Sequence, residues 1–306
     1  QPIIPQGPAI MTNKSFHARR ALMYVPGSDE GKILKAAASD LDCAILDLED
    51  GVAFNRKDEA RGLILKALKS VDFGTTERLV RINPLYSGRA EADLQAILPG
   101  KPDGILIPKA DNPQIVAAVE AQITAAEHSH GWEAGSIALL LLIESATAFI
   151  HLTSICQTSS RIQALVFGAE DFCADCGITR SIEARELLYA RSSLVLHAAA
   201  FGLQAIDMVQ INYRDTELLE RECLEAAALG FSGKTVVHPG QIATTQRLFT
   251  PSDEMITYAQ EILAGAHSAQ QAGAGVFTHE GKLVDLPVVK RAEAILAQAR
   301  AAGKIL

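Results

Sequence analysis

Two apolar runs of this chain end on carboxylates. One reads Leu142-Ile143-Glu144-Ser145-Ala146 and the other Val166-Phe167-Gly168-Ala169-Glu170-Asp171-Phe172. In an α/β protein, residues just past the carboxyl ends of parallel strands gather at one rim, so we expect Glu144 and Asp171 to lie close together. Carboxylate oxygens are the ligands that a hard cation such as Mg²⁺ prefers. The pattern therefore predicts a metal-dependent enzyme, with the alternative that one of the two carboxylates only caps a helix.

Polar side chains also follow other apolar runs of the chain. They stand in Tyr24-Val25-Pro26-Gly27 and the nearby Lys32 and Lys35, in Asp47-Leu48-Glu49-Asp50, in Arg81-Ile82-Asn83, in Pro108-Lys109 and in Val237-His238-Pro239. Packing alone does not explain so many polar groups at strand ends. We expect them to share the rim with the two carboxylates.

Short, continuously apolar runs alternate with longer amphipathic segments. The runs are Ala21 to Val25, Cys43 to Leu48, Leu79 to Ile82, Gly104 to Ile107, Ile137 to Ile143, Ala164 to Phe167, Ala205 to Val209 and Thr235 to Val237. The amphipathic segments include Arg56 to Lys69, Pro113 to Glu127 and Ile182 to Phe201. Continuous apolar runs are typical of parallel strands buried on both faces. Eight such repeats predict an α/β fold of the (β/α)₈ TIM-barrel type, and no GxGxxG follows the first run to favour a doubly wound sheet.

The two ends of the chain differ from the barrel. Residues 1–19 are expected to form an N-terminal arm, in which residues 1–10 are a cloning or processing remnant and Met11 is the native start. Residues 20–250 would form the catalytic barrel. Residues 251–306 would form a C-terminal helical extension, with helical segments Ser252 to Gln271 and Leu283 to Ala302 and a hinge at Gly273 to Gly275. Such an extension can cap its own barrel or reach the active site of a neighbouring subunit.

Composition narrows the class of partner. The 306 residues include 28 basic and 36 acidic side chains, for a formal net charge of −8. This balance argues against binding to nucleic acid or to an anionic membrane surface. No apolar run reaches the roughly 20 residues of a membrane span. The five scattered cysteines suit a reducing compartment, which we take to be the bacterial cytoplasm, with the mitochondrial matrix as the alternative.

Seven motifs together resemble one family. In chain order they are Tyr-Val-Pro-Gly, Leu-Asp-Leu-Glu-Asp-Gly-Val, Val-Arg-Ile-Asn, Ile-Glu-Ser-Ala, Phe-Gly-Ala-Glu-Asp-Phe, Phe-Gly-Leu-Gln-Ala-Ile-Asp and Gly-Lys-Thr-Val-Val-His-Pro. The chain resembles the citrate lyase β-subunit-like group of the HpcH/HpaI aldolase superfamily, which includes the citramalyl-CoA and malyl-CoA lyases. The resemblance runs from about Arg20 to the last helix. It implies a (β/α)₈ barrel, Mg²⁺ with Mn²⁺ as a substitute, and a homotrimer or a hexamer.

The resemblance also implies roles for single residues. Glu144 and Asp171 correspond to the metal ligands, and Arg81 to the arginine that faces the reacting oxygens. Asp285 corresponds to the catalytic acid/base, on a segment that folds over the active site of an adjacent subunit in relatives. Read without the family, Arg81 could pair with a neighbouring rim acid, and Asp285 could be the N-cap of a helix.

Further positions correspond to contacts with the CoA thioester or support them. Tyr24, Lys35 and the Val237-His238 pair match the substrate-binding pattern, although His238 before Pro239 could instead form a rigid turn. The acidic residues Asp47, Glu49 and Asp50 are candidates for orienting Arg81 or metal-bound water.

The resemblance implies a Mg²⁺-dependent carbon–carbon lyase. It would cleave a 3-hydroxyacyl-CoA dicarboxylate of the citramalyl-CoA or malyl-CoA type to acetyl-CoA and pyruvate or glyoxylate. Three alternatives stand beside it: a malyl-CoA thioesterase, the β subunit of a citrate lyase complex acting on citryl bound to acyl carrier protein, and a non-catalytic sensor on a barrel scaffold. The set of Glu144, Asp171, Arg81 and Asp285 argues against the sensor.

Overall fold

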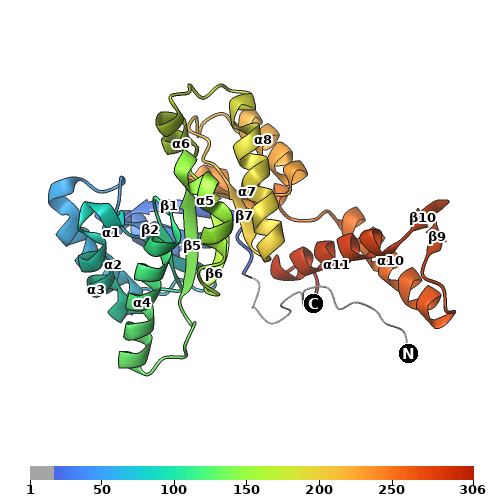
Figure 1. Cartoon of the computed structure of the whole chain (residues 1–306), viewed down its shortest axis with the longest axis horizontal. Coiled ribbons are helices and arrows are strands. Elements are labelled where there is room, and N and C mark those ends of the chain that lie inside the picture. The colour runs from blue at the N-terminus through green and yellow to red at the C-terminus, as the bar shows by residue number, and fades with distance from the viewer. Residues whose placement is uncertain (1–16) are drawn as a thin grey trace. The chain divides into compact units, whose positions relative to one another are not determined.

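A computed structural model describes residues 17–306 (Figure 1). The expectations for residues 1–10 and for a start at Met11 lie outside the described part of the chain. Two compact units follow one another, residues 19–246 and residues 247–306.

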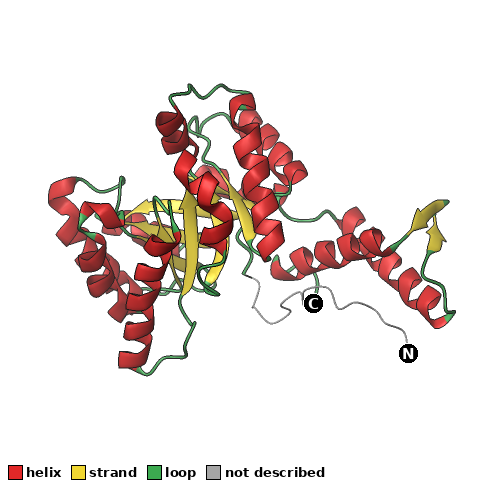
Figure 2. Ribbon diagram, in the orientation of Figure 1, coloured by secondary structure: helices red, strands yellow, loops and turns green. Residues whose placement is uncertain are grey.

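The first unit is a closed barrel of parallel strands with helices around it (Figure 2). Its strands are β1 (Ala21–Pro26), β2 (Cys43–Asp47), β3 (Glu77–Arg81), β4 (Gly104–Ile107), β5 (Ala138–Ile143), β6 (Ile162–Phe167), β7 (Gln204–Asp207) and β8 (Gly233–Val236). Each strand pairs with the next, and β8 pairs with β1 to close the ring. The predicted TIM barrel is confirmed, and each of the eight apolar runs corresponds to one strand.

Helices follow the strands and cover the outside of the barrel. They are α1 (Glu30–Ala37), α2 (Lys57–Ser70), α3 (Ala90–Ile97), α4 (Pro113–His130), α5 (Ala146–Cys156), α6 (Ala169–Cys176), α7 (Leu188–Phe201), α8 (Thr216–Leu229) and α9 (Ile242–Leu248), with short 3₁₀ turns η1 (Phe54–Arg56), η2 (Leu85–Ser87), η3 (Leu98–Gly100), η4 (Arg185–Leu187) and η5 (Pro239–Gln241). The predicted start of a helix at Ile182 is wrong, because Ala184 adopts a left-handed φ of 49° and α7 begins only at Leu188. Among residues 17–306, no helix is long and apolar enough to cross a membrane.

The barrel interior is apolar and is closed by a polar cluster at the amino ends of the strands. Alternate strand residues such as Leu22, Ile45 and Leu140 form the central core. Below them, the guanidinium of Arg19 donates to both oxygens of Glu77 at 2.5 and 2.6 Å. Arg19 also donates to the side-chain oxygen of Gln204 at 2.7 Å. These buried contacts satisfy polar groups far from the carboxyl ends of the strands, where barrel enzymes carry their chemistry.

The second unit has its own small core. Helices α10 (Asp253–Gln271) and α11 (Leu286–Ala301) pack together through residues such as Ile262 and Leu296. Between them, β9 (Phe277–His279) and β10 (Lys282–Val284) form an antiparallel hairpin. The prediction that a helical segment starts at Leu283 is therefore wrong. The hairpin turn is made by Glu280 and Gly281, both with positive φ.

Candidate active site

A cavity of about 720 Å³ lies at the carboxyl ends of the barrel strands. Of the eleven residues given a candidate role from the sequence, eight line it: Tyr24, Lys35, Asp47, Arg81, Glu144, Asp171, Val237 and His238. Glu49 reaches the same place through Arg81, whereas Asp50 is exposed and does not line the cavity. The strand ends therefore bring together acids, bases and an aromatic ring in one hollow, as the rim argument predicts.

The two carboxylates lie at neighbouring strand ends. Glu144 follows β5 and is 2% exposed, and Asp171 lies in the first turn of α6, just after β6. A lysine joins them: the Lys109 backbone N–H donates to Glu144 Oε1 at 2.8 Å, and its ammonium forms an ion pair with Asp171. The same ammonium lies 3.7 Å from Glu144 Oε1. A positive charge thus already sits between the two carboxylates.

Neither carboxylate serves as the helix cap that the alternative interpretation required. The side-chain cap of α5 is Ser145, whose hydroxyl accepts the N–H of Ala148 at 3.0 Å. The N-cap of α6 is Gly168, which has no side chain to accept a bond. Helix capping therefore occupies neither carboxylate, and both line the cavity.

The site fits a divalent cation. Burial raises the pKa of Glu144 to about 8, although the nearby Lys109 acts in the opposite direction. A bound cation would stabilise the ionised form of this buried carboxylate. Gly168 leaves the space that the Glu144 side chain occupies, because a Cβ at position 168 would lie 2.5 Å from Glu144 Cβ and 2.7 Å from Glu144 Oε2.

The number of side chains that could bind a metal indicates which ion the site suits. Within residues 17–306, no group of three or more His, Cys, Asp or Glu side chains is placed to hold a metal. Glu144 and Asp171 would supply two oxygen ligands, which suits Mg²⁺ because this ion keeps several positions for water and substrate oxygens.

Arg81 is held on two sides by acids. Its guanidinium donates to both oxygens of Asp47 at 2.6 and 2.7 Å and pairs with Glu49 at 2.6 Å. It also lies over the ring of Tyr24, 4.7 Å from the ring centroid. The alternative of an ion pair with a rim acid is thus realised with both acids, and Arg81 still lines the cavity. Burial raises the pKa of Glu49 to about 7, while Arg81 acts to lower it.

Asp47 organises the loop after β2. Its carboxylate accepts the N–H of Glu49 at 2.8 Å and the N–H of Gly51 at 2.9 Å. Gly51 approaches so closely that a Cβ would lie 2.5 Å from Asp47 Oδ2. Asp47 therefore fixes both the arginine and the turn beside it.

One wall of the cavity contains two stacked rings. The imidazole of His238 lies 4.6 Å from the ring of Tyr213, at an angle of 21° between the ring planes. His238 Nδ1 accepts the N–H of Gly240 at 3.1 Å, so the turn expected at this position is present. Val237 and both rings line the cavity.

Asp285 belongs to the second unit. Its side chain is the N-cap of α11 and accepts the N–H of Val288, with Pro287 in the first turn. The carboxylate is exposed. The capping interpretation is correct, and the catalytic role of Asp285 stays a prediction.

The sequence of this chain is similar to those of known proteins. The sequence model described as HpcH/HpaI aldolase/citrate lyase matches residues 20–239. The chain belongs to the HpcH/HpaI aldolase/citrate lyase family. The mitochondrial citramalyl-CoA lyase of Rattus norvegicus is 41% identical over 96% of this chain and 89% of its own length. The citrate lyase subunit beta of Leuconostoc mesenteroides subsp. cremoris is 36% identical over 92% of this chain and 94% of its own length.

A solved structure of the same family has a similar fold. It is CitE of Mycobacterium tuberculosis in complex with magnesium, acetoacetate and coenzyme A. It matches with a TM-score of 0.72 and 30% identity, over 92% of this chain and 97% of its own.

The sequence analysis assigned no role to three residues at or near the site of this HpcH/HpaI family member. Lys109 was visible as a polar residue after a strand, but its contact with both carboxylates depends on a left-handed φ of 48°. Tyr213 and Gln241 lie in loops without a motif of their own. A local signal for Gln241 exists in hindsight, because it stands three residues after His238, the spacing of a capping box.

Proposed function

We propose that this protein is a Mg²⁺-dependent carbon–carbon lyase. Its substrate is a 3-hydroxyacyl-CoA dicarboxylate of the citramalyl-CoA or malyl-CoA type, cleaved reversibly to acetyl-CoA and pyruvate or glyoxylate. The observation that carries the proposal is that Glu144, Asp171 and Arg81 line one cavity. The 41% identity to a citramalyl-CoA lyase, over nearly the whole chain, supports the substrate class.

Four residues of the chain would have separate roles in a Claisen-type cleavage. Glu144 and Asp171 would hold Mg²⁺, which supplies a Lewis acid for negative charge developing on the substrate oxygens. Asp285 would first accept the proton of the 3-hydroxyl, whose oxygen becomes the carbonyl oxygen of the 2-oxo acid. As the carbon–carbon bond breaks, its electron pair passes to the acetyl-CoA part as an enolate. Arg81, preset by Asp47 and Glu49, would stabilise the charge on the enolate oxygen. Asp285 would donate the proton that converts this enolate to acetyl-CoA.

The CoA part would lie along the cavity walls. Tyr24, Lys35, Val237 and His238 line it, and the exposed Lys35 ammonium can pair with a phosphate. The role of Asp50 in orienting Arg81 or metal-bound water stays a prediction, since its side chain is exposed and does not line the cavity.

The assembly and the compartment are part of the proposal. We propose a homotrimer or a hexamer in which the 247–306 unit of one subunit supplies Asp285 to the cavity of another. We assign the protein to the bacterial cytoplasm or the mitochondrial matrix, since one relative is named as mitochondrial and another comes from a bacterium.

The test is a product analysis. The purified protein is incubated with Mg²⁺ and citramalyl-CoA, malyl-CoA or β-methylmalyl-CoA, with and without EDTA, while 2-oxo acid and free thiol are followed. Metal-dependent release of a 2-oxo acid without thiol is expected. Thiol release alone would identify a thioesterase instead.

A second candidate is the β subunit of a citrate lyase complex. The 36% identity to such a subunit over 92% of this chain favours it. Cleavage of citryl attached to acyl carrier protein, together with no reaction of any free CoA ester, would decide for this candidate.

A further inference from the structure

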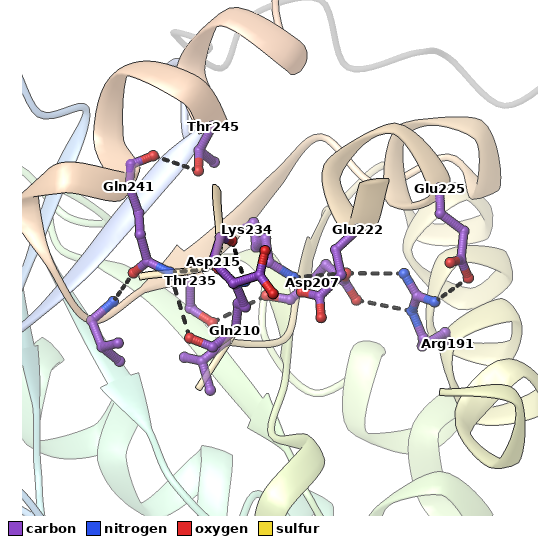
Figure 3. A network of polar contacts seen from close by, with 12 residues as sticks. Arg191, Asp207, Gln210, Asp215, Glu222, Glu225, Lys234, Thr235, Gln241 and Thr245 are labelled. Atoms are coloured by element: carbon purple, nitrogen blue, oxygen red, sulfur yellow. Dashed lines mark hydrogen bonds and ion pairs between the residues drawn. The ribbon is translucent and has the colours of Figure 1, made fainter. Parts of the chain in front are cut away.

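Two buried glutamines join the loops that follow β7 and β8. Gln210 lies shortly after β7 and Gln241 ends η5 after β8, and each is 1% exposed. Figure 3 shows the two side chains facing one another across the gap between their loops. The amide nitrogen of Gln241 donates to the side-chain oxygen of Gln210 at 3.1 Å.

The backbone fixes the orientation of both amides. Gln241 Oε1 accepts the N–H of Val237 at 3.0 Å and the N–H of His238 at 3.2 Å, and only an oxygen can accept two such bonds. Gln210 Nε2 donates to the carbonyl of Asp215 at 2.7 Å, which only a nitrogen can do. Each amide therefore presents the group that the other needs.

The contacts of this amide pair lead to one wall of the cavity. Gln241 holds the backbone of Val237 and His238, which line the cavity. Gln210 holds the carbonyl of Asp215, two residues after Tyr213. Tyr213 and His238 are the two rings stacked on that wall. Neither glutamine lines the cavity itself.

We propose that Gln210 and Gln241 are positioning residues that hold this wall in the shape that binds acyl-CoA. The inference rests on the proposed function, because it takes Val237, His238 and Tyr213 as the surface for the CoA thioester. Their loops belong to different strands, so without the amide pair the two rings would be placed by separate loops. The carboxylates and Arg81 lie on other elements and keep their own contacts. Loss of the pair should therefore weaken binding and leave the chemical step nearly intact.

The principal variant is Gln241→Met, which keeps the length of the side chain and removes both the acceptor and the donor. We expect KM for the acyl-CoA substrate to rise about tenfold, the worth of roughly one hydrogen bond, while kcat changes less than about twofold. The matched control is Gln204→Met, which removes a buried amide at the amino end of β7 that accepts from Arg19. The control should lower the melting temperature and leave KM at the wild-type value.

Gln241→Glu separates the two halves of the contact. An ionised carboxylate still accepts the two backbone N–H groups but sets a buried oxygen against the side-chain oxygen of Gln210, so KM should rise at least as far as in Gln241→Met. If Gln241→Met does not fold, as judged by circular dichroism, Gln241→Glu decides alone. A wild-type KM in every folded Gln241 variant, an equal rise of KM in Gln204→Met, or a loss confined to kcat would overturn the proposal.

Separate experiments test the positioning role of the two glutamines and the proposed function of the protein. A wild-type protein that cleaves none of the CoA esters would refute the function. The positioning role is then judged by titration calorimetry with free CoA, where Gln241→Met should bind about tenfold more weakly than the wild type. Equal affinities would refute the positioning role.

Discussion

The carboxylates of Glu144 and Asp171 share one basic partner, Lys109. Glu144 is buried and Asp171 is open to the cavity, yet both meet the same lysine. The residue types and their places after two strands could be predicted from the sequence. The part played by Lys109 could not, because a left-handed backbone at a lysine has no sequence signal.

Asp285 permits a clean test of its chemistry. We expect Asp285→Asn to lower kcat at least about a hundredfold, because an amide cannot supply the proton that general acid catalysis needs. Asparagine caps helices as well as aspartate does, so α11 should keep its stability. Turnover of the CoA ester and the melting temperature are the measurements.

Asp285→Ala serves as the companion variant. It removes the cap and should cost about 1 kcal/mol of stability in addition to the loss of activity. Wild-type turnover in Asp285→Asn would show that this carboxylate is not the acid/base.

At the scale of elements, the strands were predictable and some connections were not. Buried parallel strands form continuous apolar runs, so each of them stood out in the sequence. The hairpin of β9 and β10 was missed because strands of three residues are too short to show an alternating pattern. The late start of α7 was missed because the polar residues before Leu188 fit a helix as well as a loop.

The turn between β6 and α6 lies against Glu144, the proposed metal ligand. We expect Gly168→Ala to weaken Mg²⁺ binding at least about tenfold, because its Cβ would push the Glu144 side chain away from its place. Calorimetric titration with Mg²⁺ measures the effect.

Gly62→Ala is the matched control for this substitution. Gly62 lies inside α2, and a Cβ there meets no atom within 4 Å. Because alanine favours the helical conformation more than glycine, the free energy of unfolding of this variant should rise by about 0.5–1 kcal/mol. Its Mg²⁺ affinity should equal that of the wild type. Unchanged Mg²⁺ affinity in Gly168→Ala would argue against Glu144 as a ligand.

At the scale of the whole molecule, protonation links stability to metal binding. In the folded chain the pKa of Glu144 is about 8, against an ordinary value of 4.5. The folded state therefore holds a proton that the unfolded state has released within this range, and the free energy of unfolding falls as pH rises from about 4.5 to about 8.

The expected outcome is a melting temperature that falls with pH in metal-free buffer, more steeply for the wild type than for Glu144→Gln. Added Mg²⁺ competes with the proton, so the stabilisation by Mg²⁺ should grow as pH rises through the same range. Scanning fluorimetry from pH 5 to pH 8 checks both trends. The same pH slope in both proteins would show that Glu144 is not the group responsible.

The proposed sharing of the active site makes a second prediction at this scale. Glu144→Gln and Asp285→Asn subunits should each be inactive alone, since one would lack a proposed metal ligand and the other the proposed acid. Subunits mixed at random should regain about a quarter of wild-type activity, because a site needs an intact barrel from one chain and an intact tail from another. No recovery after confirmed mixing would place both groups in the same chain.

The cysteines have a practical consequence. Cys176, at the end of α6, is exposed, whereas the other four cysteines are buried. A maleimide dye should therefore attach at this thiol without any engineering of the chain. Because α6 also carries Asp171, the emission of such a dye would report in real time, and without a chemical assay, when the cavity fills and empties.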